Sequence, residues 1–202
     1  MQRGVGYILG LMLACWVLPL PAQAMPRQVI LLRHGDKDTS RGDSNLSPEG
    51  FLRSVNLGRL LPACFGPIDR IGTFEFAFDT QKNARSYQTA VPLAVATGLQ
   101  IRVFRGVIEN TELAGSLMRV EPWAADKRVV LFWEHQRLPA LAKALGWEGM
   151  QPIDNANFDN LYLLRFNPGE AAPQVEQLSQ KQLFQRPCFR DAVSPLPVVP
   201  LP

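Results

Sequence analysis

The chain has 202 residues, of which 47% are hydrophobic and 19% charged, which is enough for one hydrophobic core and marginal for two. Its formal net charge is +3, and the basic residues are spread along the chain rather than gathered into a run. This distribution excludes a basic tail of the kind that binds nucleic acid. We therefore expect one main domain that does not bind nucleic acid and can still carry a local cationic site.

The N-terminus has the three parts of a secretory signal peptide. Arg3 supplies the positive region, Tyr7 to Leu20 an apolar run, and Ala22 to Ala24 a small-x-small cleavage motif. The alternative, an uncleaved membrane anchor, is disfavoured because the apolar run is short and prolines interrupt its end. We expect residues 1–24 to be removed by cleavage near Ala24. The mature protein would then be periplasmic or secreted, with no membrane segment.

Export changes the interpretation of the cysteines. Once the signal peptide is removed, Cys64 and Cys188 remain as an even pair in an oxidising compartment. A disulfide between them would tie the region after the first helix to the C-terminal tail. The alternative is two free, buried thiols.

Strand-like apolar runs alternate with helical patterns along the mature chain. Ser47 and Pro48 are a helix start, as N-cap and first-turn residue, and Pro62 is expected to end that helix. The predicted strands span 28–32, 74–78, 101–104, 129–133 and 161–166, and the predicted helices span 48–61, 83–97, 111–120 and 139–145. Repeated β–α units predict an α/β fold with three layers, in which a mostly parallel sheet has helices on both faces. We expect a domain over residues 25–186 and an extended, poorly ordered, proline-rich tail over 187–202.

Both histidines of the chain directly follow predicted strands. His34 follows Arg33 in "LLRHGD", and His135 follows the apolar run "VVLFW" in "VVLFWEHQ". Ligands of parallel sheets bind beyond the carboxyl ends of the strands, so the fold can bring the two imidazoles together. Arg85 stands at a helix start, where a cation opposes the helix dipole, and an anionic ligand explains it better than helix stability does.

Several segments together resemble the histidine phosphatase superfamily, the group of the phosphoglycerate mutases and histidine acid phosphatases. They are "RHGDK", "NLSPEG", "ARSYQTAVPLA", "FWEHQ" and "NFDNLYLL", and they extend from about Gln28 to Phe166. The likeness is greatest to small exported bacterial members with a Trp-Glu-His motif. The resemblance implies a phosphoglycerate mutase-like fold and a phosphomonoesterase that needs no cofactor. It also implies that His34 is the nucleophile and that Arg33, Arg85 and His135 bind the phosphate.

The chemistry of these residue types supports the same assignment. A neutral imidazole can attack phosphorus and carry the phosphoryl group as phosphohistidine, which water then cleaves. Arg33 and Arg85 offer planar forks of donors to phosphate oxygens, and their charges lower the pKa of His34. Lys37 stands where related acid phosphatases often have a further phosphate-binding arginine. Two histidines without a cysteine or carboxylate at ligand spacing do not predict a metal site.

The residue that protonates the leaving group is left open by the sequence. The acid phosphatases place Asp directly after the second histidine, where this chain has Gln136. Glu109 has a spacing comparable to that of the glutamate in the mutase-like branch and is the preferred candidate. Glu112 fits better as a favourable charge in the first turn of a helix, and strand alternation predicts that Glu134 points away from the pocket. The charge of Asp36 would oppose phosphate unless it is neutralised.

These observations favour a phosphomonoester hydrolase that acts on a phosphorylated small molecule. A phosphomutase is disfavoured by the predicted export, and a non-catalytic phosphate-binding module stays open because the acid is ambiguous. Arg27, Arg53 and Arg59 are expected to be ordinary surface cations. The natural substrate and the oligomeric state are not encoded in any recognisable pattern, and segments 105–121 and 146–159 carry no readable code for the substrate.

Overall fold

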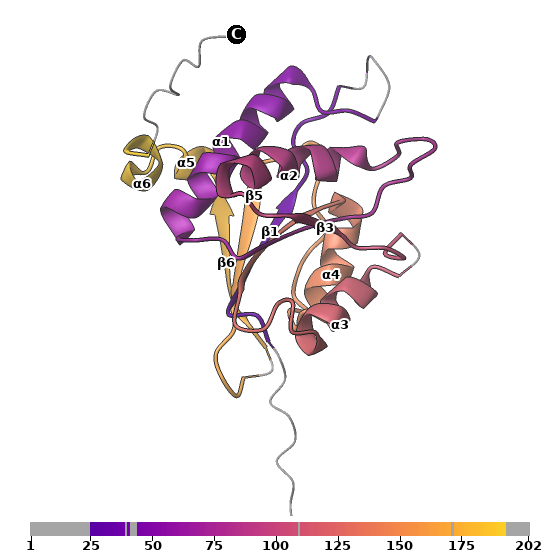
Figure 1. Cartoon of the computed structure of the whole chain (residues 1–202), viewed down its shortest axis with the longest axis vertical. Coiled ribbons are helices and arrows are strands. Elements are labelled where there is room, and N and C mark those ends of the chain that lie inside the picture. The colour runs from indigo at the N-terminus through magenta and orange to yellow at the C-terminus, as the bar shows by residue number, and fades with distance from the viewer. Residues whose placement is uncertain (1–24, 39, 41–43, 109, 171, 193–202) are drawn as a thin grey trace, which may run out of the picture.

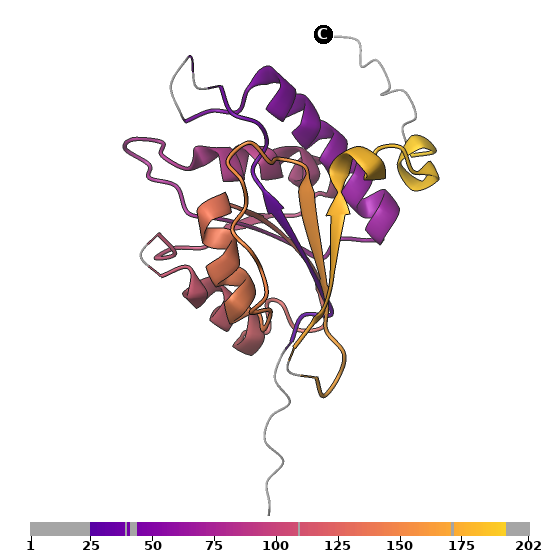
Figure 2. The same ribbon diagram turned by 180° about the vertical axis from the view of Figure 1, so that it is seen from behind.

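The computed structural model describes residues 25–192 except 39, 41–43, 109 and 171. The predicted signal peptide, Glu109 and residues 193–202 of the predicted tail lie outside the described residues. The described part is a central sheet with helices on both sides (Figures 1 and 2).

The sheet has six strands in the order β3-β2-β4-β1-β5-β6. Their bounds are β1 Gln28–Arg33, β2 Arg70–Thr73, β3 Ile101–Val103, β4 Arg128–Trp133, β5 Asn160–Arg165 and β6 Gln174–Ser179. Strands β1 to β4 pair in parallel, whereas β5 is antiparallel to both β1 and β6. The predicted, mostly parallel sheet is confirmed, with an antiparallel pair of strands at one edge.

Two helical layers cover the sheet, as predicted. The helices are α1 Pro48–Phe65, α2 Ala84–Thr97, α3 Glu112–Val120, α4 Leu138–Ala144, α5 Gln180–Leu183 and α6 Pro187–Arg190, and a 3₁₀ turn, η1 His135–Arg137, precedes α4. In Figure 1, α1 and α2 lie on one side of the sheet and α3 and α4 on the other. Strand β1 serves both cores: Ile30 and Leu32 pack with α1 and α2, while Val29 and Leu31 face the core of α3 and α4. This is why its apolar run is continuous.

The predicted caps of the long helices are present, but α1 runs further than expected. Ser47 Oγ accepts a hydrogen bond from the Gly50 backbone N–H at 3.1 Å, and Gly98 ends α2 in the left-handed conformation. Pro62 lies within α1, which continues to Phe65. A proline near a helix end removes one hydrogen bond, and here packing of the last turn outweighs that loss.

The predicted second strand, 74–78, is wrong. The strand β2 is Arg70–Thr73, and Phe78 beyond it is 70% exposed. Gly72 weakens the sequence signal of this strand. The glycine is required because a Cβ there would lie 2.6 Å from Leu131 and 2.7 Å from Phe104.

The predicted extended tail is wrong for its first residues. Pro187–Arg190 forms α6, Phe189 is buried against α1 and α2, and Cys188 is disulfide-bonded to Cys64. The disulfide and the buried Phe189 side chain therefore order this segment, although its proline content predicted an extended and poorly ordered tail. Among the described residues, none of the helices is both long and apolar enough to cross a bilayer.

Candidate active site

The two histidines meet at the rim formed by the carboxyl ends of β1 and β4. These central strands are paired in parallel, with Arg33 opposite Trp133, and the backbone N–H of His34 donates to the carbonyl of Trp133 at 3.2 Å. The centroids of the His34 and His135 rings are 6.4 Å apart, and the rings are nearly perpendicular. Parallel pairing thus brings together two imidazoles that are about a hundred residues apart in the chain.

His34 is held as a neutral imidazole with one free nitrogen. Its side chain is 3% exposed, and Nδ1 lies 2.8 Å from the carbonyl of Gly35. A carbonyl only accepts, so Nδ1 carries the proton and Nε2 has the free lone pair. Burial, together with the positive charges of Arg85 and Arg33, lowers the pKa of His34 to about 3. The ring is therefore unprotonated at neutral pH, as a nucleophile must be.

Arg33 is held in place by the loop before β5. Its Nη1 donates to the carbonyls of Asp154, Asn155 and Asn157 at 3.2, 2.8 and 3.0 Å, and its guanidinium stacks 3.8 Å above the Phe158 ring. Its buried Nε has no hydrogen-bond partner in the part of the chain that the structure describes. Burial lowers the pKa of Arg33 to about 10, so the group stays charged at neutral pH. A buried cation with an unused donor is strongly stabilised by an anion.

Arg85 completes the cationic side of the site. It is the second residue of α2, is 7% exposed, and its charge acts on both His34 and Arg33. One turn later, Thr89 Oγ1 donates to the Arg85 carbonyl at 2.7 Å and accepts from the Gly35 N–H at 2.9 Å. The start of α2 is thereby tied to the loop after β1, and two guanidinium groups lie around one imidazole.

The loop after β1 is packed tightly against α1. A Cβ on Gly50 would lie 2.2 Å from the Asp36 carbonyl oxygen, so only glycine allows this approach. Arg53 Nε lies 2.7 Å from Asp36 Oδ2 and neutralises its charge. The prediction that Arg53 is an ordinary surface cation is therefore wrong, and the opposition of Asp36 to phosphate is reduced.

Glu134 lies at the site, contrary to the prediction that it points away. Strand β4 ends at Trp133, so alternation no longer applies, and Glu134 caps η1 by accepting from the Gln136 N–H at 2.9 Å. Its Oε1 is 2.6 Å from His135 Nδ1. Burial alone would raise the pKa of Glu134, but the adjacent His135 ring and the Gln136 N–H lower it below its usual value. The carboxyl group is therefore ionised.

The loop before β5 contributes residues that were not among the predicted site residues. Asn155 Oδ1 lies 2.6 Å from His135 Nε2, and the centroid of the Phe158 ring is 5.9 Å from that of His34. Phe158 belongs to the "NFDNLYLL" segment, so the resemblance gave one signal for it. Asn155 had none, because an isolated asparagine in a loop is common.

The remaining candidates are less involved. Lys37 forms an isolated backbone bridge with Leu46 and is partly buried. Glu112 is exposed in the first turn of α3, and Glu109 lies outside the described residues. In the described part of the chain, no cluster of three or more histidine, cysteine or acidic side chains is placed to hold a metal ion.

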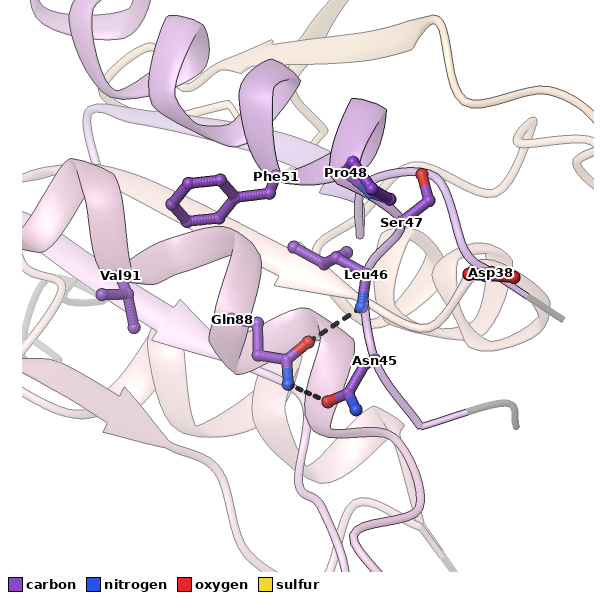
Figure 3. Close-up of a pocket in the computed structure, with 8 residues that line it drawn as sticks. All are labelled: Asp38, Asn45, Leu46, Ser47, Pro48, Phe51, Gln88 and Val91. Carbon is purple, nitrogen blue, oxygen red and sulfur yellow. Dashed lines mark hydrogen bonds between the residues drawn. The ribbon is translucent and has the colours of Figure 1, made fainter. Parts of the chain in front are cut away.

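Two surface pockets flank these groups. One has a volume of about 500 Å³ and is lined by His135, Gln136, Pro139, Pro152, Ile153, Asp154 and Asn155. The other, of about 540 Å³, lies between the starts of α1 and α2 (Figure 3), where Gln88 accepts from the Leu46 N–H and donates to Asn45 Oδ1. This second pocket is slightly larger but contains neither histidine. The pocket beside His135 is therefore the better candidate for substrate entry.

No family model matches the sequence, and no curated protein is significantly similar to it. Several solved structures, in contrast, have a similar fold. A mycobacterial glucosyl-3-phosphoglycerate phosphatase aligns over 76% of this chain and 97% of its own, at 19% identity and a TM-score of 0.52. The protein histidine phosphatase SixA complexed with tungstate aligns over 77% and 99%, at 16% identity and 0.51. A protein assigned as the phosphohistidine phosphatase SixA of Agrobacterium tumefaciens aligns over 76% and 98%, at 18% identity and 0.55. The chain therefore shares the three-layer α/β fold of these phosphatase structures.

Proposed function

We propose that this protein is a phosphomonoester hydrolase that acts through a phosphohistidine on His34 and uses no metal. The observation that carries the proposal is the state of His34: it is buried, neutral, anchored through Nδ1, and flanked by the charges of Arg33 and Arg85. A structural histidine needs neither an unused Nε2 nor two neighbouring cations.

The geometry supports a reaction in two displacements. Nε2 of His34 attacks phosphorus while the leaving alcohol departs on the opposite side, and water then attacks the phosphohistidine. Charge on the phosphoryl oxygens is stabilised by preorganised donors, which cost no reorganisation during the reaction. Arg33 is such a group, because three loop carbonyls hold its Nη1 and fix a positive charge that acts on His34.

Export to an oxidising compartment is part of the proposal. The signal-peptide pattern over residues 1–24 motivates it, and the bond between Cys64 and Cys188 supports it, since such bonds persist mainly outside the cytosol. Edman sequencing of the exported protein tests the cleavage site. An N-terminus at residue 1 in the exported form would contradict it.

The central experiment is turnover by the wild-type protein and by His34→Ala. We expect release of phosphate from an aryl phosphate by the wild type, loss of at least about a thousand-fold in His34→Ala, and acid-labile phosphate trapped on the wild-type protein only. Arg59→Gln, on the exterior of α1, is the matched control and is expected to keep full activity. Full activity of His34→Ala would refute the nucleophile.

Two other outcomes decide between functions. No turnover of any phosphomonoester, combined with tight binding of inorganic phosphate, would select a non-catalytic phosphate-binding module. The fold neighbours act on different substrates, a glucosyl-3-phosphoglycerate and a protein phosphohistidine, as their names state. A panel of sugar, nucleotide and lipid phosphates and of a phosphohistidine peptide would therefore identify the substrate class.

A further inference from the structure

The described residues leave an apolar surface over α1 and α2 uncovered. Phe51 and Leu52 on α1 are 54% and 62% exposed, and Val91 and Val95 on α2 are 37% and 79% exposed. A single exposed apolar side chain is ordinary, whereas several large ones on two neighbouring helices mark an interaction surface. Phe51 and Val91 both line the pocket of about 540 Å³ between the starts of the two helices (Figure 3).

The polar side chains of this pocket are already used within the protein. Gln88 accepts from the Leu46 N–H at 3.0 Å and donates to Asn45 Oδ1 at 2.6 Å. Asp38 Oδ1 accepts from the backbone N–H and the hydroxyl of Ser40. The side chains left to contact an occupant are mostly apolar, namely Leu46, Pro48, Phe51 and Val91. The pocket therefore fits an uncharged apolar segment better than it fits a phosphorylated substrate.

The C-terminal residues of the chain have the matching chemistry. Residues 193–202, "VSPLPVVPLP", contain five valines or leucines, four prolines and no charged side chain. A sequence of this kind favours the polyproline II conformation, and proline-rich segments bind in grooves lined by aromatic and apolar side chains. Proline also has no N–H, so the segment brings few donors that the pocket would have to satisfy.

The segment starts close enough to reach the pocket. Cys188 is bonded to Cys64 near the end of α1, with their Cα atoms 5.2 Å apart, and α6 ends at Arg190. Phe51 precedes Cys64 by 13 positions in the same helix, which corresponds to about 20 Å. Ten residues in polyproline II extend over about 31 Å. The segment can therefore run back along the exposed side of α1, past Leu52, and place its last residues in the pocket.

We propose that residues 193–202 dock across the exposed side of α1 and fill the pocket between the starts of α1 and α2. Because the disulfide ties the segment to the same helix, its effective concentration at the pocket is on the order of millimolar, and modest apolar contacts suffice. Leu46 of the pocket wall is paired with Lys37, so the docked segment contacts the loop that begins at His34. The docking does not depend on the proposed phosphatase activity.

The test is the amide chemical shifts of the full-length protein in two-dimensional ¹H–¹⁵N NMR. Leu201→Asp places a charge where the segment reaches the pocket, and Ser194→Asp, the matched control, places the same charge where the segment begins. We expect Leu201→Asp to shift the signals of residues 45–52 and 88–95, and Ser194→Asp to shift only signals near α6. Val91→Asp, on the pocket side, should in turn shift the signals of residues 196–201.

Truncation after Ala192 gives a second measurement. It should shift the same pocket signals, and a synthetic peptide of residues 193–202 should restore them when it is added at millimolar concentration. The peptide with Leu201→Asp should bind at least about ten-fold more weakly, because a leucine side chain is no longer buried.

Three results would overturn the docking. Pocket signals in Leu201→Asp that coincide with those of the wild type would do so, and so would shifts confined to residues 60–65 and 183–192. Shifts whose size depends on protein concentration would assign the pocket to a second copy of the chain. If the truncated protein does not fold, Leu201→Asp and Val91→Asp decide the question in the full-length chain.

Discussion

Because the proton affinity of His34 differs between the folded and unfolded protein, stability must depend on pH. The pKa of His34 is about 3 in the folded protein and about 6.5 in an unfolded chain. Between these values the unfolded chain binds a proton that the folded protein does not, so stability falls as pH falls through this window. At about 1.4 kcal/mol per pKa unit, the full effect is about 5 kcal/mol, of which about 3 kcal/mol is lost between pH 7 and pH 4.

Replacing His34 by Gln removes this titration and keeps the size of the side chain. We expect wild-type protein to lose about 3 kcal/mol more unfolding free energy than His34→Gln when the pH is lowered from 7 to 4. Urea unfolding at both pH values measures the difference, and all other titrating groups cancel in the comparison. Parallel losses in the two proteins, within about 1 kcal/mol, would show that His34 is not held neutral by burial and by the neighbouring guanidinium groups.

Three further perturbations test other parts of the structure. The double variant Cys64→Ala/Cys188→Ala should lose about 5 kcal/mol of unfolding free energy in urea, because the disulfide closes a sequence separation of 124 residues. A loss below about 1 kcal/mol would contradict a stabilising disulfide. Arg53→Gln should weaken binding of inorganic phosphate about 5-fold in calorimetry, since Asp36 loses a partner at 2.7 Å, and unchanged affinity would refute the neutralisation. Gly50→Ala should cost about 2 kcal/mol of stability, because its Cβ would lie 2.2 Å from a backbone oxygen, and unaltered unfolding would contradict that contact.

The sequence predicted the features that depend on local pattern. The strands after which the histidines stand are long, continuous apolar runs, and the caps at Ser47 and Gly98 have fixed chemical requirements. The three-layer sheet followed from the alternation of such elements. Because parallel strands end at the same edge of a sheet, the predicted strands place Arg33, His34 and His135 at one rim.

Features that depend on tertiary context were missed. Strand β2 contains Gly72, so its own sequence gives only a weak apolar signal. The space beside this glycine is filled by the side chains of Phe104 and Leu131, which belong to other segments. Arg53 looks like any exposed cation until the fold brings it to Asp36. The expectation for Glu134 extended strand alternation beyond Trp133, where β4 ends and the chain turns into η1, so the predicted direction of its side chain was wrong.

The largest omission, the loop over residues 154–158, has a topological cause. Parallel strands have their carboxyl ends at the rim that carries the site. If the strand over residues 161–166 is assumed to be parallel, its site residues are expected to follow the strand. Strand β5 is antiparallel to β1, with Leu161 opposite Leu32, and its beginning therefore lies at that rim. The residues that precede β5 are the ones that hold Arg33 and contact His135. Reversal of one neighbouring strand thus supplies an additional loop to the site, and in any sheet of this kind the segment before the antiparallel strand should be searched for residues that orient the catalytic groups.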